Sequence, residues 1–285
     1  MEIISAIILG LVEGLTEFVP ISSTGHLILT GHMLGFEGRV GQQIAAALEV
    51  FIQLGAVLAV VVAYPGRFAA LLRITNNRGF SGARGLGLLL ATTLPAALLG
   101  LATHSLITEY LFCPLSVAFG LFAGGLWILG VERRKPRPKK QGLDAVGWTD
   151  ALVVGLFQCL SLWPGVSRSA ATILGGMAGG LDRRTATEYS FFAAVAIIPA
   201  AGLYELYKVW PCLSPGHFSM FAVGTLVAFL AGWMAVKCLI RFLSHHTLSV
   251  FGWYRLVVAL LVTCTVGWPM IREIWSHFSR LLGAG

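Results

Sequence analysis

Long apolar runs alternate with short polar segments along most of the chain. Six of these runs come close to the roughly 20 residues that a helix needs to cross a bilayer. They span residues 45–64, 86–107, 112–131, 188–209, 218–241 and 249–268. Four further apolar runs are too short to cross and form two interrupted pairs. The pattern predicts an all-α polytopic membrane protein with six transmembrane helices.

The two interrupted pairs share one plan. Residues 2–18 and 26–35 flank the first break, and residues 148–162 and 169–180 flank the second. Both breaks are rich in proline, glycine and hydroxyl side chains, which stop a helix and free its backbone groups. Hydrocarbon tolerates such groups only inside protein or beside a wet cavity. We therefore predict two re-entrant helical hairpins.

The two halves of the chain repeat each other weakly. Residues 10–18 (GLVEGLTEF) align with residues 155–163 (GLFQCLSLW) at an offset of 145, and a one-residue gap then pairs Ser23 with Ser167. A chance match is the alternative, although the order of one hairpin and three spans also repeats. Three crossings between the hairpins invert the second half relative to the first. Many transporters have this inverted-topology repeat, with their site at the midplane between broken helices.

This repeat divides the chain into four parts. The first repeat covers residues 1–131, a basic linker follows at 132–147, and the second, inverted repeat covers residues 148–268. The C-terminal tail, 269–285, mixes aromatic and basic residues, so we expect it to lie at the membrane interface.

Charge supports this division and orients it. Only 12% of the residues are charged and 56% are hydrophobic, whereas soluble domains carry ~25% charged residues. The formal net charge of +7 does not indicate nucleic acid, because the basic residues lie in short loops. One side of the predicted topology receives fourteen Lys and Arg and the other receives four. The positive-inside rule makes the basic side cytoplasmic and places both termini outside the cytoplasm.

Two carboxylates occupy one face of the first hairpin helix. Glu13 and Glu17 are four residues apart and therefore share a helix face. A carboxylate in the membrane is costly and usually marks a functional pathway. Two of them repel each other unless a cation lies between them or one is protonated. The pair predicts a hard divalent cation, Mg²⁺ or Ca²⁺, bound through oxygen. The alternative is a solvated helix face near the membrane surface.

Hydroxyl side chains crowd the first break. Ser22, Ser23 and Thr24 are followed two residues later by His26. This arrangement offers a nucleophile, for which we favour Ser23, and an imidazole that can act as its base or as an acid to a leaving group. The alternative is that the hydroxyls cap the helix and His26 is a structural hydrogen-bonding residue.

The second break, residues 164–172, reads PGVSRSAAT. It delivers Ser167, Arg168 and Ser169 to the start of a helix, where free N–H groups and the helix dipole favour an anion. The planar guanidinium of Arg168 matches phosphate oxygens, and Thr172 lies one turn further along the same face. The alternative is an arginine that pairs with the acidic residues for structure alone. Together the two breaks predict an anion held with a metal, which is phosphoryl chemistry.

Three other charged residues fall within apolar segments. Glu49, Glu188 and Arg255 either support the site from behind or only cap and bridge helices. The sequence leaves these two readings open.

The stretches 13–26 (EGLTEFVPISSTGH) and 164–172 resemble the bacterial undecaprenyl-diphosphate phosphatase family of the bacitracin-resistance type. The two motifs, their order, the chain length and the inverted-repeat plan agree over essentially the whole chain. The resemblance implies a phosphatase of the bacterial inner membrane that removes the terminal phosphate of undecaprenyl diphosphate. It thereby recycles the lipid carrier for peptidoglycan precursors. It also implies a divalent cation and a site reached from the outer side of the membrane.

Carried over residue by residue, the resemblance implies a set of site residues. They are Glu13 and Glu17 for the metal, Ser23, His26, Glu17 and Arg168 for catalysis, and Ser167, Arg168, Ser169 and Thr172 for the substrate. It does not decide whether a serine or an activated water attacks phosphorus. The expected partners are a polyprenyl diphosphate lipid and membrane lipids, and a homodimer is left open by the Gly-rich run at 175–180. The alternative function is an inverted-repeat transporter or lipid flippase.

Overall fold

The computed structural model describes residues 2–73, 78–111, 113–134 and 137–267. Over these ranges the protein is built from helices and has no β-strand. The tail predicted at 269–285 lies outside the described residues.

Within the described ranges, five helices are long and apolar enough to cross a membrane, judged by length and composition. They are α4 (Gln42–Ala63), α6 (Gly82–Leu106), α7 (Pro114–Arg133), α10 (Arg183–Val209) and α11 (Phe218–Leu243). The sixth predicted span forms the shorter α12 (Ser249–Val262) and a π-helical turn, η5 (Thr263–Gly267), where the description ends. The multi-pass character is therefore present, whereas the sixth full-length span is not seen in the described part.

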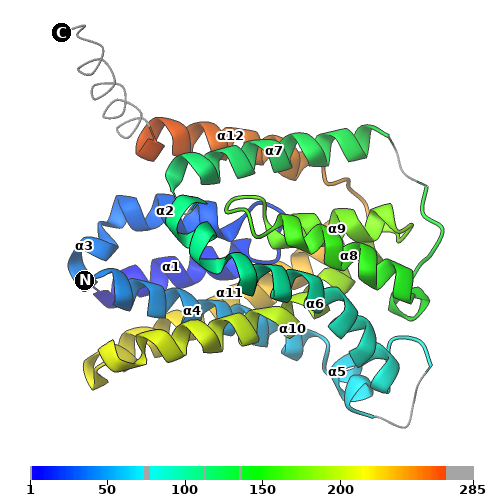
Figure 1. Cartoon of the computed structure of the whole chain (residues 1–285), viewed down its shortest axis with the longest axis horizontal. Helices are drawn as coiled ribbons and strands as arrows, with labels where there is room; N and C mark the ends of the chain where they lie inside the picture. The colour runs from blue at the N-terminus through cyan, green and yellow to red at the C-terminus, as the bar shows by residue number, and fades with distance from the viewer. Residues whose placement is uncertain (1, 74–77, 112, 135–136, 268–285) are drawn as a thin grey trace, which may run out of the picture.

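Two helical hairpins complete the bundle. The first consists of α1 (Glu2–Thr16) and α2 (Ser23–Leu34), and the second of α8 (Trp148–Leu160) and α9 (Arg168–Ala178). Figure 1 shows that they enter the bundle from opposite ends and that their turns meet near its middle. Short elements connect the rest: α3 (Phe36–Val40), α5 (Pro65–Leu72), η1 (Ile107–Leu111), η2 (Leu143–Ala145), η3 (Trp210–Cys212) and η4 (Pro215–His217).

Glycines let the first helix of each hairpin pack closely on a span of the other half. Gly10 of α1 faces the backbone of Gly224 in α11, and Gly155 of α8 faces the backbone of Thr92 in α6. A Cβ at either glycine would overlap the partner's backbone, so close helix packing requires glycine there. The two glycines stand at the predicted offset of 145, and α11 and α6 are the second spans of their halves.

The turns of the two hairpins also match without any gap. Ser22 directly precedes α2 with a φ of 72°, and Ser167 directly precedes α9 with a φ of 74°. The predicted one-residue gap is therefore wrong. Ser22 corresponds to Ser167, and Ser23 corresponds to Arg168, at the same offset of 145.

The glycine-rich run of α9 packs inside the protomer, because Gly175 lies against Phe157 of α8. A homodimer stays a prediction.

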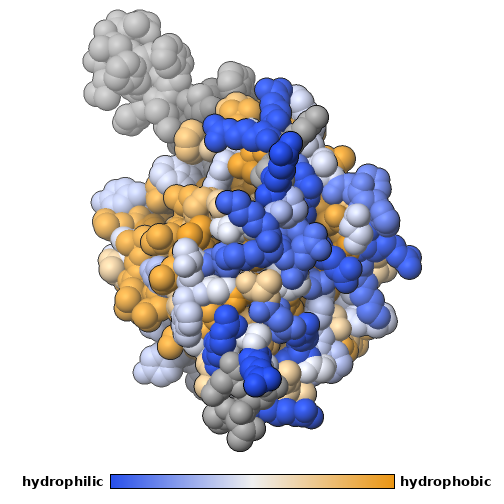
Figure 2. Space-filling view, turned by 90° about the vertical axis from the view of Figure 1, so that its right-hand side faces the viewer, coloured by the Kyte–Doolittle hydropathy of each residue, from blue (hydrophilic) through white to orange (hydrophobic). Residues whose placement is uncertain are grey.

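The end of the bundle that carries the connecting loops is polar. Asp144 of η2 accepts hydrogen bonds from Arg67 and from the N–H of Phe80, while Lys140 pairs with Asp150 at 2.7 Å. Figure 2 looks at this end and shows hydrophilic residues gathered across its middle with hydrophobic residues at the flanks. The N-terminus lies at the opposite end (Figure 1). The loops predicted to share one side of a membrane therefore share one end of the bundle.

Candidate active site

A cavity of about 190 Å³ lies where the two hairpin turns meet. Polar side chains and backbone from both turns form most of its wall, and α4 and α10 close it. Its lining residues are Glu17, Ser22, Ser23, Thr24, Gln53, Ser161, Leu162, Pro164, Gly165, Ser167, Arg168 and Ile198.

Glu17 and Arg168 form an ion pair between the hairpins. Glu17 follows the last residue of α1, and Arg168 is the first residue of α9. Nη2 of Arg168 lies 3.3 Å from Oε1 of Glu17, and Nη1 donates to the carbonyl of Ser190 at 3.1 Å. The side chains of the pair are only 13% and 10% exposed. The fold thus brings a carboxylate and a guanidinium that are 151 residues apart in sequence to one cavity wall.

Ser23 completes the contacts of Glu17. Its hydroxyl donates to Oε2 of Glu17 at 2.6 Å. The hairpin turn makes this possible, because it reverses the chain between the end of α1 and the start of α2. Ser23 and Arg168 occupy corresponding positions of the two hairpins, so both second helices direct their first side chain at the same carboxylate.

Glu13 lies one helical turn before Glu17 and is fully buried. Among the described residues no donor reaches either oxygen of its carboxylate, which lies beside that of Glu17. A buried carboxylate without a donor needs a proton or a cation. Two neighbouring carboxylates supply hard oxygen ligands of the kind that Mg²⁺ and Ca²⁺ prefer. The residues present therefore fit a divalent cation.

Side chains alone would not saturate such a cation. In the described part of the chain, no group of three or more His, Cys, Asp or Glu side chains is placed to hold a metal ion. Mg²⁺ is commonly held by one or two carboxylates, with water and substrate phosphates filling the remaining positions. An anionic ligand in the cavity would supply those oxygens.

Ser169 and Thr172 hold α9 in place and are not among the residues that line the cavity. The hydroxyl of Ser169 donates to the carbonyl of Val19 in the first turn at 3.0 Å. That of Thr172 donates to the carbonyl of Arg168 at 2.8 Å and bonds the hydroxyl of Ser190 at 2.6 Å. Both side chains are fully buried. Ser167, in contrast, lines the cavity, and its Oγ accepts a bond from the N–H of Ala170 at 3.2 Å.

His26 has partners other than Ser23. Nδ1 lies 2.7 Å from the carbonyl of Ser22, and Nε2 lies 2.8 Å from the hydroxyl of Tyr254. The imidazole also stacks on the Tyr254 ring at 5.6 Å between centroids. Since a carbonyl only accepts, the proton is assigned to Nδ1, and Nε2 of the neutral ring then accepts from Tyr254. The expected contact of His26 with Ser23 does not form here, because Ser23 bonds Glu17.

Arg255, whose role the sequence left undecided, bridges several backbone segments around the site. Its guanidinium is fully buried and donates to backbone carbonyls of both hairpin turns and of α7. The acceptors are Pro20 at 3.4 Å, Gly165 at 2.9 Å, Val166 at 2.9 Å, Gly120 at 3.0 Å and Leu121 at 3.3 Å. Arg255 therefore ties the two turns together and satisfies carbonyls that the helix breaks leave open.

The remaining undecided residues do not line the cavity, although Glu49 is close enough to Glu13 for the two carboxylates to interact. Glu188 pairs with Arg184 on its own helix at 3.1 Å, and Glu49 is not among the residues that line the cavity. Sequence reasoning missed Gln53, which reaches the cavity from α4. Its only signal was a polar amide within an apolar run, one turn after Glu49.

Comparison with known proteins gives a consistent answer. The family described as "Bacitracin resistance protein BacA" matches residues 6–261. A protein of Nitratidesulfovibrio vulgaris (strain DP4) named undecaprenyl-diphosphatase is 54% identical over 261 residues, covering 92% of this chain and 97% of the relative. Proteins with the same name from Oleidesulfovibrio alaskensis and Aromatoleum aromaticum are 51% and 45% identical. They cover 96% and 95% of this chain and 99% and 97% of their own lengths.

Proposed function

Because the chain belongs to the BacA family of bacitracin resistance proteins, we propose that it is an undecaprenyl-diphosphatase of the bacterial inner membrane. It hydrolyses undecaprenyl diphosphate to undecaprenyl phosphate and inorganic phosphate, which returns the lipid carrier to cell-wall synthesis. The observation that carries the proposal is the meeting of Glu17 and Arg168, from opposite hairpins, at the wall of one polar cavity. A polar cavity with a guanidinium and the carboxylate of Glu17 on its wall, and with Glu13 buried one helical turn before Glu17, suits a phosphate anion held together with a cation.

We also propose a membrane arrangement for the chain. Six spans and two re-entrant hairpins form an inverted repeat, with the polar loop end in the cytoplasm and both termini outside. The basic loops support this orientation, and the hydrophilic residues at that end of the bundle suit a membrane surface (Figure 2). The cavity then lies near the midplane and is reached from the outer side.

The chain's own residues supply binding and proton transfer. Arg168 and the free N–H groups at the start of α9 hold the terminal phosphate and stabilise charge that develops on it. Ser23 attacks the terminal phosphorus while its proton passes to Glu17, the carboxylate 2.6 Å away. The bond from phosphorus to the bridging oxygen breaks and undecaprenyl phosphate leaves. Water then hydrolyses the phosphate ester on Ser23, which releases inorganic phosphate and restores the serine hydroxyl. A water activated by the same carboxylate is the alternative attacking group.

The supporting residues keep this arrangement in place. His26 lies three residues after Ser23 on the same helix face, and for it to transfer protons at the site its ring has to leave the Ser22 carbonyl and the Tyr254 hydroxyl, to which it is hydrogen-bonded. Glu13 and Glu17 would hold the divalent cation. When bound, the cation neutralises charge on the phosphate oxygens.

A phosphate-release assay tests the proposal. Purified protein in detergent should release phosphate from undecaprenyl diphosphate, and a chelator should abolish the release until Mg²⁺ or Ca²⁺ is restored. Release that is absent under all cation conditions would refute the activity, and release that is indifferent to chelator would refute the cation.

The two opposed hairpins also favour a second candidate, a lipid carrier or flippase, because transporters use this arrangement. Detergent removes every gradient, so phosphate release in detergent identifies the enzyme. Counterflow of labelled lipid across a vesicle membrane without hydrolysis would identify the carrier.

A further inference from the structure

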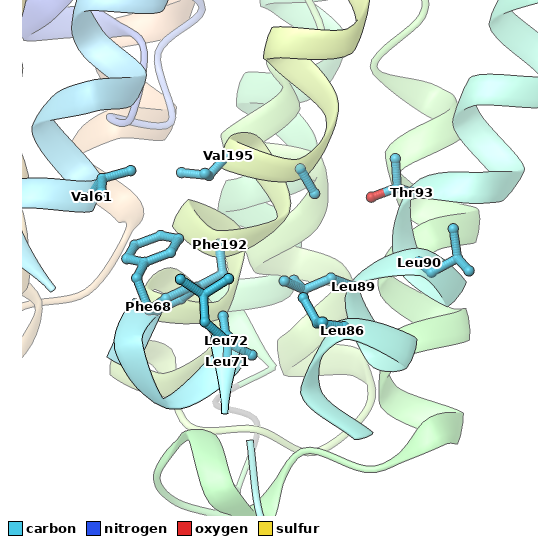
Figure 3. A pocket seen from close by; sticks show the side chains of 11 residues that line it. Val61, Phe68, Leu71, Leu72, Leu86, Leu89, Leu90, Thr93, Phe192 and Val195 are labelled. Carbon is cyan, nitrogen blue, oxygen red and sulfur yellow. The ribbon is translucent and has the colours of Figure 1, made fainter. Parts of the chain in front are cut away.

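An apolar groove of about 480 Å³ lies between α4, α5, α6 and α10 (Figure 3). Every side chain that lines it is apolar except Thr93. Val61 and Phe68 form one wall, Leu89 and Thr93 of α6 form the other, and Phe192 and Val195 of α10 lie between them (Figure 3). The volume falls within the range of small-molecule sites, ~300–1,000 Å³.

The groove lies close to the active-site cavity along α10. Val195 lines the groove and Ile198 lines the cavity. Three helical residues rise about 4.5 Å, so one turn of α10 separates the two spaces. Helix α6 also passes both spaces. Its Gly100 lies against Leu162, which lines the cavity, and its Thr93, two helical turns before Gly100, lines the groove.

We propose that this groove binds the isoprenoid chain of a prenyl diphosphate whose diphosphate lies in the cavity, so that it determines chain-length preference. The proposal rests on the proposed function. A polar cavity of about 190 Å³ accommodates a diphosphate but not a long apolar chain, which has to leave it over an apolar surface. The groove beside Ile198 provides that surface.

A second apolar groove supplies a matched control. It measures about 410 Å³ and includes Phe51 of α4 and Ala222 of α11. Phe51 is two residues from Gln53 of the cavity, and at 3.6 residues per turn the two face about 160° apart on α4. This groove therefore lies on the far side of α4 and has no direct path to the cavity.

The test compares the same substitution in the two grooves. Ala196→Phe narrows the first groove, and Ala222→Phe narrows the second. For each variant, KM for undecaprenyl diphosphate is measured in detergent together with the inhibition constant of dimethylallyl diphosphate, which has a diphosphate but no long chain. Ala196→Phe should raise KM roughly tenfold and leave the inhibition constant unchanged. Ala222→Phe should change neither.

Three outcomes would overturn the groove proposal. They are an unchanged KM for Ala196→Phe, an equal rise of KM and inhibition constant, and an equal rise of KM in both variants. The last would indicate a general effect of a bulky substitution on the helix bundle rather than a specific effect on the substrate chain. If the wild-type protein releases no phosphate, the proposed function fails instead, so the two failures are distinguishable.

Photocrosslinking of the wild-type protein tests the groove without any substitution. An undecaprenyl diphosphate analogue with a photoreactive group in its chain should label α6 and α10 around residues 86–93 and 192–196. Excess dimethylallyl diphosphate should compete the labelling away by displacing the diphosphate. Labelling confined to residues 218–229, or labelling that resists competition, would contradict the proposal.

Discussion

Ser22 and Ser167 occupy the same backbone position in the two hairpins. Their φ angles are 72° and 74°, and they are the non-glycine residues with positive φ among those that the structure describes. A side chain in such a conformation costs about 1–3 kcal/mol. The strained turns are useful because each directs the following residue, Ser23 or Arg168, at the carboxylate of Glu17. The strain is thus located where the two halves of the site are aligned.

Two substitutions at Ser22 separate backbone strain from side-chain chemistry. Glycine adopts positive φ freely, whereas a β-branched residue is a severe outlier there. Ser22→Gly should therefore keep the unfolding free energy within about 1 kcal/mol of the wild type, and Ser22→Val should lower it by about 1–3 kcal/mol. Thermal unfolding in detergent measures both, and Ser167 should show the same order. Equal melting temperatures for the glycine and valine variants would disprove the strain.

The hairpin breaks could be predicted because proline, glycine and hydroxyl residues interrupt apolar runs locally. The role of Arg255 could not, because its acceptors include Pro20 and Gly165, which are 235 and 90 residues away. The error of one residue in the repeat has a similar cause. Matching prolines suggested a gap, whereas the backbone equates Ser22 with Ser167.

The hydrogen-bond partner of Ser23 also could not be predicted from the spacing of residues in the sequence. His26 lies three residues away on the same helix, which made it the natural candidate from spacing. The turn, however, folds α2 back on α1 and places Glu17 at 2.6 Å from the hydroxyl. The cavity itself needs residues from α4 and α10, namely Gln53 and Ile198, and no motif joins them to the hairpins.

The packing of α7 against Arg255 gives a second prediction. A Cβ at Gly124 would overlap the Arg255 guanidinium, whereas a Cβ at Gly130 on the same helix meets open space. Gly124→Ala should lower the unfolding free energy by about 1–3 kcal/mol by overpacking and should reduce phosphate release, because Arg255 holds both turns. Gly130→Ala should leave activity intact and raise stability by up to about 1 kcal/mol. Similar melting temperatures for the two variants would argue against the role of Arg255.

Asp144 gives a pH-dependent prediction at the polar end. The N–H of Phe80, and then the Arg67 guanidinium, hold the pKa of Asp144 below its ordinary value. A lowered pKa means that the ionised carboxylate stabilises the fold above the unfolded pKa of about 3.9, and that this stability is lost as the pH falls through the folded value. Asp144→Asn should therefore lower the melting temperature at neutral pH, and its difference from the wild type should shrink below about pH 4. A difference that stays constant down to the lowest pH would contradict this.

Glu13 tests the cation site by a change of charge without a change of size. Glu13→Gln removes a buried carboxylate that no donor reaches within the described chain, so the apo protein should become more stable. Activity should fall, and half-maximal activity should need a higher cation concentration. Glu37→Gln, at an exposed carboxylate of α3, is the control and should leave the cation dependence unchanged. An unaltered cation titration for Glu13→Gln would remove Glu13 from the proposed site.

Arg168 and Arg184 offer a comparison between two arginines that each pair with a glutamate. Arg168 pairs with Glu17 at the cavity and is 13% exposed, whereas Arg184 pairs with Glu188 on its own helix and is 58% exposed. If Arg168 stabilises charge on the transferred phosphate, Arg168→Ala should reduce kcat by about 10²–10³, the effect of losing one preorganised donor. Arg168→Lys should recover only part of this, since an ammonium lacks the planar fork. Arg184→Ala should keep near-normal turnover. Phosphate release from folded Arg168→Ala at the rate of Arg184→Ala would reduce Arg168 to a structural partner of Glu17.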